Sequence, residues 1–98
     1  MISLINVFTV DPANQQRLID LLSRATDEFV SCAPGFVSSI LHRSLDGTKV
    51  AMYAQWRSVE AMQAMQHNPT AREHMVLCAD VADGFEPHLY TVESVHEA

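Results

Sequence analysis

The chain has 98 residues, 48% of them hydrophobic, and its six basic and twelve acidic residues give a formal net charge of −6. This length predicts a single domain over residues 1–98. The acidic balance excludes partners that require a basic patch, namely nucleic acids and anionic membrane surfaces.

The two cysteines, Cys32 and Cys78, lie far apart and have no Cys or His at metal-ligand spacing. They are interpreted as reduced, buried thiols, with a disulfide as the alternative. No apolar run reaches membrane-spanning length, and the N-terminal residues lack the basic segment and cleavage site of a signal peptide. We therefore expect a cytoplasmic protein with no membrane contact and no metal site.

The first half of the chain predicts a strand followed by a helix. Residues 2–10 are rich in β-branched and aromatic types, as strands are. Asp11 and Pro12 then supply an N-cap and a first helical position. Pro34-Gly35 ends the helix, whose apolar stripe comprises Leu18, Leu22, Ala25, Phe29 and Cys32.

The second half predicts a hairpin and a broken helix. Strands are expected over residues 36–45 and 48–57, joined at Asp46-Gly47, which is a strong turn signal. Ser58 can cap a short helix, and Asn68-Pro69 interrupts and restarts it. Gly84 closes the helix, and a last strand is expected over residues 85–95.

The resulting order, β-α-β-β-α-β, predicts an α+β, ferredoxin-like βαββαβ fold with a four-stranded antiparallel sheet in the order 4-1-3-2. Pro87 in the last strand fits an edge position, where a missing N–H is tolerated.

Both faces of the central strands are apolar. The first strand carries Leu4 and Phe8 on one face and Ile5 and Val7 on the other, and residues 50–56 repeat this pattern. The helices can cover only one face, so the second face predicts a homodimer formed through the sheet.

The segment LHRSLDGTKVAMYAQWRSVEAM (residues 41–62), with PGF upstream at residues 34–36, resembles the antibiotic biosynthesis monooxygenase superfamily of dimeric α+β barrel proteins. The resemblance implies a homodimer with a small-molecule cavity between sheet and helices in each subunit. The family's best-understood members oxidise polycyclic phenols, anthrones or quinols with molecular oxygen and use no cofactor. Others degrade haem or small signalling molecules, so the fold alone does not fix the reaction.

Family members of the antibiotic type carry a His on the second strand and an Asn and a Trp on the third. His42 and Trp56 match this pattern, and Met52 replaces the Asn. Period-two counting from Phe36 through Ser38 and Ile40 places His42 on one face of its strand, and Met52 shares a face with Trp56. A thioether cannot replace an amide as a hydrogen-bonding group.

We therefore expect His42 and Trp56 to be the catalytic residues. Histidine can accept a phenolic proton near neutral pH, and the indole can stack on an aromatic ring and donate its N–H. The alternative is that both are ordinary core residues.

The other candidates for substrate binding are Asn6, Met52, Met62, Met65 and His74. Asn6 is a polar residue within an apolar strand and needs a partner or ligand if it is buried. Asn6 and His74 together also resemble the haem-degrading branch, but the position of its iron ligand falls at Met75 and its tryptophan is replaced by Met65. The methionines fit core filling or an adaptable wall for a flat ligand.

Two functions follow: a cofactor-independent monooxygenase acting on an aromatic phenol, anthrone or quinol, or a non-catalytic homodimeric binding or accessory protein. Haem degradation is a less favoured third. Retained His42 and Trp56 favour the first, and Met52 favours the second.

Overall fold

A computed structural model describes residues 1–98. The elements follow the predicted order: β1 (Ile2–Thr9), α1 (Gln15–Glu28), β2 (Phe36–Arg43), β3 (Lys49–Trp56), α2 (Val59–Gln66), α3 (Pro69–Val81) and β4 (Gly84–Tyr90), with short 3-10 turns at Pro12–Asn14 and Val30–Cys32. None of the helices combines the length and hydropathy needed to cross a membrane.

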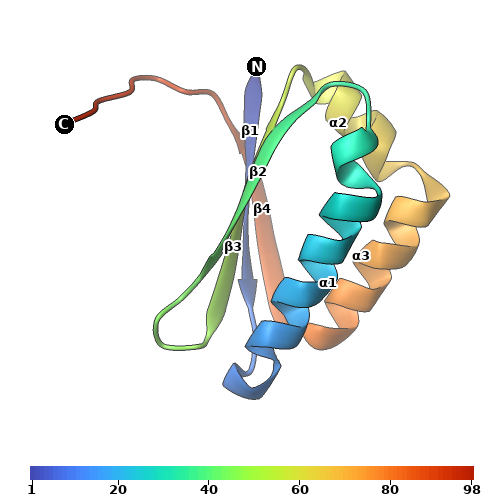
Figure 1. The fold of residues 1–98 in the computed structure, drawn as a ribbon, viewed down its shortest axis with the longest axis vertical. Coiled ribbons are helices and arrows are strands. Elements are labelled where there is room, and N and C mark those ends of the chain that lie inside the picture. Colours follow the sequence, from blue (N-terminus) through green and yellow to red (C-terminus); the bar gives the residue numbers. More distant parts are fainter.

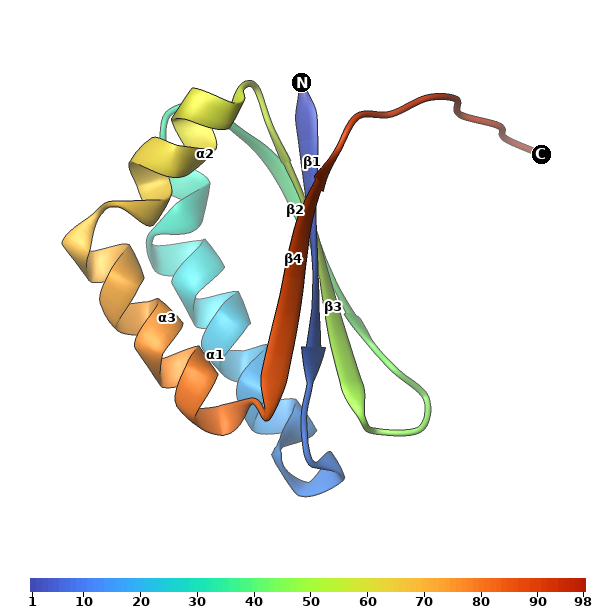
Figure 2. The ribbon, with the colours of Figure 1, turned by 180° about the vertical axis from the view of Figure 1, so that it is seen from behind.

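The four strands form one antiparallel sheet in the order β2-β3-β1-β4. This confirms the predicted ferredoxin-like layout, with β4 and its Pro87 at an edge. The helices all lie on one face of the sheet, which we call the helix face, and the opposite face is bare (Figures 1 and 2). The fold is therefore a two-layer α+β sandwich with one uncovered sheet surface.

Side-chain caps fix where the helical segments begin. The Asp11 carboxylate accepts a hydrogen bond from the Ala13 N–H, the Ser58 hydroxyl accepts one from the Ala61 N–H, and the Asn68 amide oxygen accepts one from Thr70. Each satisfies a backbone donor that the first helical turn leaves unpaired. The predicted starts at Ser58 and Asn68 are thereby confirmed, whereas Asp11 caps the 3-10 turn Pro12–Asn14 and α1 itself begins at Gln15.

The first helix is shorter than predicted. It ends at Glu28, and residues 30–32 form a 3-10 turn, so the apolar stripe does not extend to Cys32. Cys32 is exposed, whereas Cys78 is buried, and both are free thiols. The expectation of two buried thiols is therefore wrong for Cys32, because the last part of the stripe has left the helix.

Two clusters of buried residues lie between the sheet and the helices. One is centred on Phe8, Leu18 and Val50 and includes Val10, Leu22, Cys78 and Val81. The other comprises Leu4, Ala54, Trp56 and Met62. They fill the two ends of the interlayer space and leave its middle less densely packed.

A β-bulge at the start of β2 changes which side chains face the helices. Phe36 pairs with Trp56, but Ser38 pairs with Gln55, so Val37 is an extra residue in the β2 strand. An extra residue reverses the alternation of side chains beyond it. Phe36 therefore faces the helices, whereas Ser38 and the residues that alternate with it face the bare side.

The last strand is also shorter than predicted. β4 ends at Tyr90, which pairs with Ser3 near the start of β1. Only Ile2 of β1 lies beyond Ser3, so β1 is too short to pair with residues 91–95, and the tail leaves the sheet on the bare side (Figure 1).

Gly35 occupies a position that other residues cannot take without strain. Its φ is +87°, and a Cβ placed there would lie 2.5 Å from the Ala61 Cβ. We expect Gly35→Ala to lower the free energy of unfolding by about 1–3 kcal/mol, measured by urea denaturation. Gly84→Ala is the control, because a Cβ at Gly84 meets nothing within 4 Å. Equal destabilisation by the two substitutions would contradict this role.

Asp46 organises the β2–β3 hairpin turn. Its carboxylate accepts hydrogen bonds from the Thr48 N–H, the Thr48 hydroxyl and the Ser44 hydroxyl, and these lower the pKa of Asp46 from 3.8 to about 2. Because the folded-state pKa lies below the unfolded value, the carboxylate stabilises the fold above the unfolded pKa, and that stability is lost as the pH falls toward 2. We expect the wild type to be more stable than Asp46→Asn at pH 7, with the difference shrinking between about pH 5 and pH 2. Urea denaturation across this range tests it, and a pH-independent difference would contradict it.

Candidate functional site

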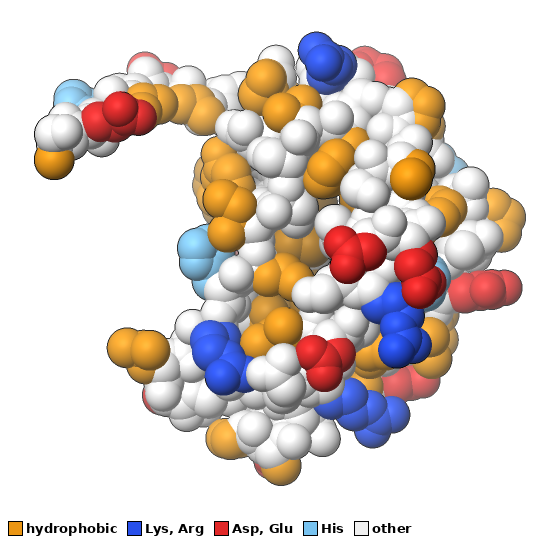
Figure 3. Space-filling model, viewed as in Figure 1, with side chains coloured by type: hydrophobic (Ala, Val, Ile, Leu, Met, Phe, Trp, Pro, Cys, Tyr) orange, Lys and Arg blue, Asp and Glu red, His pale blue; other side chains and the backbone are white.

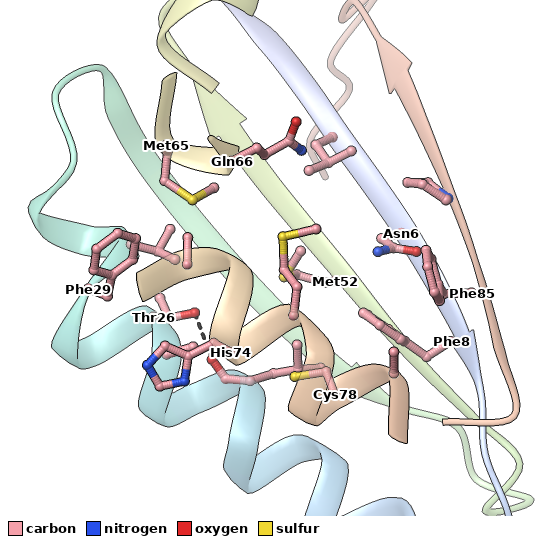
Figure 4. A pocket seen from close by; sticks show the side chains of 18 residues that line it. Asn6, Phe8, Thr26, Phe29, Met52, Met65, Gln66, His74, Cys78 and Phe85 are labelled. Carbon is pink, nitrogen blue, oxygen red and sulfur yellow. Dashed lines mark hydrogen bonds between the residues drawn. The ribbon is translucent and has the colours of Figure 1, made fainter. Parts of the chain in front are cut away.

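A cavity of about 180 Å³ lies in the middle of the interlayer space, between the helices and the sheet (Figure 4). Thirteen of its 18 lining residues are hydrophobic. The lining comprises Leu4, Asn6, Phe8, Leu22, Ala25, Thr26, Phe29, Val30, Met52, Met65, Gln66, Ala71, His74, Met75, Cys78, Ala79, Phe85 and Pro87. Such a wall suits a largely apolar small molecule.

The periodicity of the surrounding elements places these side chains. Leu4, Asn6 and Phe8 alternate along β1 and therefore share its helix face, and Asn6 pairs with Met52 on β3. On the opposite wall, residues at helical spacing in α3 turn the same way, among them His74 and Cys78. Sheet and helices thus each present one row of side chains to the cavity.

Asn6 is the polar group that most needs a partner here. Its Oδ1 is buried and makes no hydrogen bond within the protein. The neighbouring strands explain why: Asn6 pairs with Met52 on β3 and with Pro87 on β4, and neither side chain can donate a hydrogen bond. A ligand that lies in the cavity could supply the missing partner.

His74 lies on the helix side of the same cavity. It is half-buried on α3, and Thr26 of α1 also lines the cavity (Figure 4). The Thr26 hydroxyl donates to the Leu22 carbonyl at 2.9 Å, so only its oxygen remains to accept a hydrogen bond from a ligand. His74 is the one histidine among the residues that line the cavity, and imidazole is the side chain most often used for general acid–base catalysis.

Cys78 lines the cavity but is not a reactive group. Burial raises the pKa of the Cys78 thiol, which keeps it protonated and weakly nucleophilic. The side chain belongs to the core cluster of Phe8 and Leu18. No three His, Cys, Asp or Glu side chains are grouped so that they could hold a metal ion.

The expected position of His42 in the cavity is wrong. His42 pairs with Ala51, and its neighbour Leu41 pairs with Met52, so His42 faces the bare side of the sheet and is exposed. The cause is the bulge at Val37, which lies between Phe36 and His42 and reverses the alternation on which the prediction relied.

Trp56 lies on the helix face of the sheet and Met62 packs against it from α2, and neither residue lines the cavity. Trp56 is only 1% exposed and forms a cluster with Leu4, Ala54 and Met62. Its indole meets the Phe36 ring edge to face, with centroids 5.5 Å apart and planes at 83°. In this structure both residues have the core position that the sequence left open as the alternative.

The structure does bring four of the predicted residues together. Asn6, Met52, Met65 and His74 all line the cavity, although they come from β1, β3, α2 and α3. Figure 4 shows Met52 between Asn6 and the His74 side, so the sheet wall is apolar between the two polar groups.

Sequence reasoning missed several lining residues, including Thr26, Phe29, Gln66 and Phe85. Phe29 belongs to the apolar stripe predicted for the first helix but was not assigned to the site, and Thr26 could have been found because it follows Leu22 at helical spacing. Gln66 adjoins Met65 at the end of α2 and had no comparable signal. Phe85 required the β1–β4 register, in which it pairs with Phe8.

The fold and its cavity define a small α+β domain with a largely apolar pocket between its sheet and its helices. A sequence profile of the antibiotic biosynthesis monooxygenase family matches residues 1–76. The chain is 40% identical over 82 residues to tetracenomycin-F1 monooxygenase of Streptomyces glaucescens, which is 84% of this chain and 73% of that relative. The chain therefore belongs to the antibiotic biosynthesis monooxygenase family.

Solved structures agree with this assignment. The monooxygenase ActVA-Orf6 of Streptomyces coelicolor, solved in complex with nanaomycin D, superposes with a TM-score of 0.90 at 28% identity, over 99% of this chain and 91% of that one. SnoaB of Streptomyces nogalater, a cofactor-independent oxygenase, gives a TM-score of 0.82 at 24% identity, over 96% and 94% of the two chains. At that identity the SnoaB likeness is one of fold.

Proposed function

We propose that the protein is a cofactor-independent monooxygenase that oxidises a flat phenol, anthrone or quinol with molecular oxygen in this cavity. The observation that carries the proposal is the unpaired Asn6 amide in an apolar pocket that also holds His74. An apolar wall selects an aromatic ring system, and the two polar groups can bind oxygen substituents on it. The monooxygenase activity of the named relatives supports the reaction class.

The reaction balances without an added reductant. When a ring CH₂ becomes a carbonyl, the substrate loses four electrons and O₂ accepts four. One oxygen atom remains on the substrate carbon and the other leaves as water. A phenol or anthrone must first lose a proton, because the anion is the electron-rich species that passes an electron to O₂. The resulting radical pair combines to a peroxide at the ring carbon. As its O–O bond breaks, the second hydrogen of that carbon passes to the outer oxygen, which leaves as hydroxide while the inner oxygen becomes the carbonyl.

In this scheme His74 takes the place that the sequence suggested for His42. It accepts the substrate proton and returns it to the departing hydroxide as water forms. Asn6 Nδ2–H donates a hydrogen bond to the substrate oxygen that carries the developing negative charge, and the unpaired Oδ1 can accept one from a substrate hydroxyl. Trp56 supports the wall from behind through its cluster with Leu4, which itself lines the cavity.

One observation favours a second function. Met52 lies on the sheet wall between the polar groups, where the family pattern has an amide, and a thioether supplies packing but little hydrogen bonding. A homodimeric protein that binds the aromatic molecule without converting it is therefore the alternative.

Oxygen uptake by the purified, metal-free protein tests the proposal. We expect turnover of at least one compound from a panel of anthrones, dihydroxynaphthalenes and quinols, above the rate without protein. His74→Ala should lower kcat about a hundredfold, because a positioned general base contributes on this scale. Asn6→Ala should also lower it, and exposed His67 provides the control variant His67→Ala, which should retain full activity.

Three further measurements distinguish the proposed monooxygenase from the alternative base, the binding protein and haem degradation. Loss of activity in His42→Ala but not in His74→Ala would contradict the assignment of the base. Binding without oxygen uptake would favour the binding protein. A Soret shift on titration with haem, lost in His74→Ala, would instead support haem degradation, and we expect no such shift.

We also propose that the protein pairs with a second copy through the bare sheet face. Ile5, Val7, Ile40 and Tyr53 form an apolar strip there, and Val7 and Ile40 are exposed. Figure 3 shows hydrophobic side chains along this side of the molecule, between the hairpin and the C-terminal tail. An apolar sheet face of this kind is stabilised when a second surface covers it.

Light scattering after gel filtration tests the pairing. We expect wild type to have twice the chain mass of 10.9 kDa and the double variant Val7→Glu/Ile40→Glu to have the single mass. A buried like-charge pair at the contact would oppose association. Val76→Glu, at an exposed position on α3, is the control and should stay dimeric. A monomeric wild type would contradict the proposal.

A further inference from the structure

The cavity is open on one side, between α3 and β4. Most of its lining residues are buried or half-buried, but Met75 of α3 is 51% exposed and Phe85 of β4 is 55% exposed. Ala79 and Pro87, which line the cavity on the same two elements, are exposed as well. Exposed lining residues mark where a cavity meets solvent, so these four form its rim.

The architecture accounts for this opening. α3 packs against α1 and α2, and β4 is an edge strand whose only partner is β1. Figure 2 shows β4 and α3 as the two elements on this side of the molecule. Residues 91–98, which follow β4, form neither helix nor strand and run toward the bare side of the sheet, away from this edge.

We propose that the substrate enters between α3 and β4, and that Phe85 and Met75 determine specificity by packing against the outer rings of a large ring system. This inference rests on the proposed function for the identity of the ligand. It assigns to the rim residues a role in capture and size selection that is separate from the chemistry at Asn6 and His74.

The geometry of Phe85 suits this role. Its ring lies 6.1 Å from the Phe8 ring with an interplanar angle of 41°, so one side is held by the cavity floor while much of the residue meets solvent. An aromatic ligand extending through the opening would cover this exposed surface and gain apolar burial. Across the rim, the unbranched Met75 side chain can adjust to the ligand's outline.

Size selection follows from where the rim lies. A one-ring phenol fits within the enclosed volume and makes little use of Phe85 or Met75. A three- or four-ring compound exceeds it and must rest on the rim. Removing a rim side chain should therefore weaken binding of the larger ligand more than that of the smaller one.

The entrance can be tested with a matched pair of substitutions on one helix. Ala79 lies on the rim, whereas Val76 is exposed on α3 outside the cavity lining. We expect Ala79→Trp to slow association of 1,8-dihydroxyanthraquinone at least tenfold and Val76→Trp to leave it unchanged, measured by stopped-flow absorbance. This ligand is already a quinone and needs no oxygen chemistry. Equal association rates in the two variants would contradict an entrance between α3 and β4.

Specificity is tested by truncating the rim. We expect Phe85→Ala and Met75→Ala each to weaken anthraquinone binding about three- to tenfold and phenol binding less than twofold. Leu77→Ala, exposed on α3 but outside the lining, is the control for both. Because Met75 is exposed on a helix, Met75→Ala retains the fold even if Phe85→Ala does not. An equal loss of affinity for the two ligands would contradict the proposed size selection.

These measurements fail independently of the proposed function. If no compound consumes oxygen but Ala79→Trp still blocks anthraquinone binding, the monooxygenase proposal falls and the entrance stands. If oxygen is consumed but Ala79→Trp and Val76→Trp bind anthraquinone at the same rate, the monooxygenase proposal stands and the proposed entrance is wrong.

Discussion

The pairing of β1 with β3 is the constraint on which the rest of the structure depends. The two strands pair along their full length, from Ile2 opposite Trp56 to Thr9 opposite Lys49. This register aligns two rows of apolar side chains on each face of the sheet centre. One face is covered by α1, α2 and α3 and encloses the cavity, while the other is left bare. If the pairing of the two strands shifted by one residue, side chains would move to the opposite face of the sheet. Neither the sheet wall of the cavity nor the apolar bare face would then form.

The cavity exists because the two core clusters fill the ends of the interlayer space and not its middle. A vacancy in a protein interior forgoes packing energy, and an unpaired buried amide costs about 1–3 kcal/mol more. Asn6 adds this cost at the same place, between Met52 and Pro87, which offer it no partner. Such a combination has no benefit for stability alone, and a ligand that occupies the cavity and pairs with Asn6 offsets both costs.

Much of the fold could be predicted from local sequence signals. The caps at Asp11, Ser58 and Asn68, the hairpin signal at Asp46-Gly47 and the position of Pro87 each depend on contacts within a few residues or on a missing N–H. The candidate site was predicted only in part. Asn6, Met52, Met65 and His74 share the cavity because they lie on regular elements, where periodicity holds. His42 lies beyond a bulge, and the alternation counted from Phe36 no longer applies to it.

The sequence by itself determined the order of elements, the amphipathic faces of the helices and the doubly apolar central strands, because these are set by residue type and spacing. Only the tertiary structure decided which face each β2 side chain occupies, where β4 ends and which residues close or open the cavity. Those features depend on pairing between distant segments: the insertion of Val37 relative to β3, the end of β1 opposite Tyr90, and the edge position of β4 beside α3. One extra residue in a strand reverses every side chain beyond it, and no local pattern in β2 marks where that residue stands.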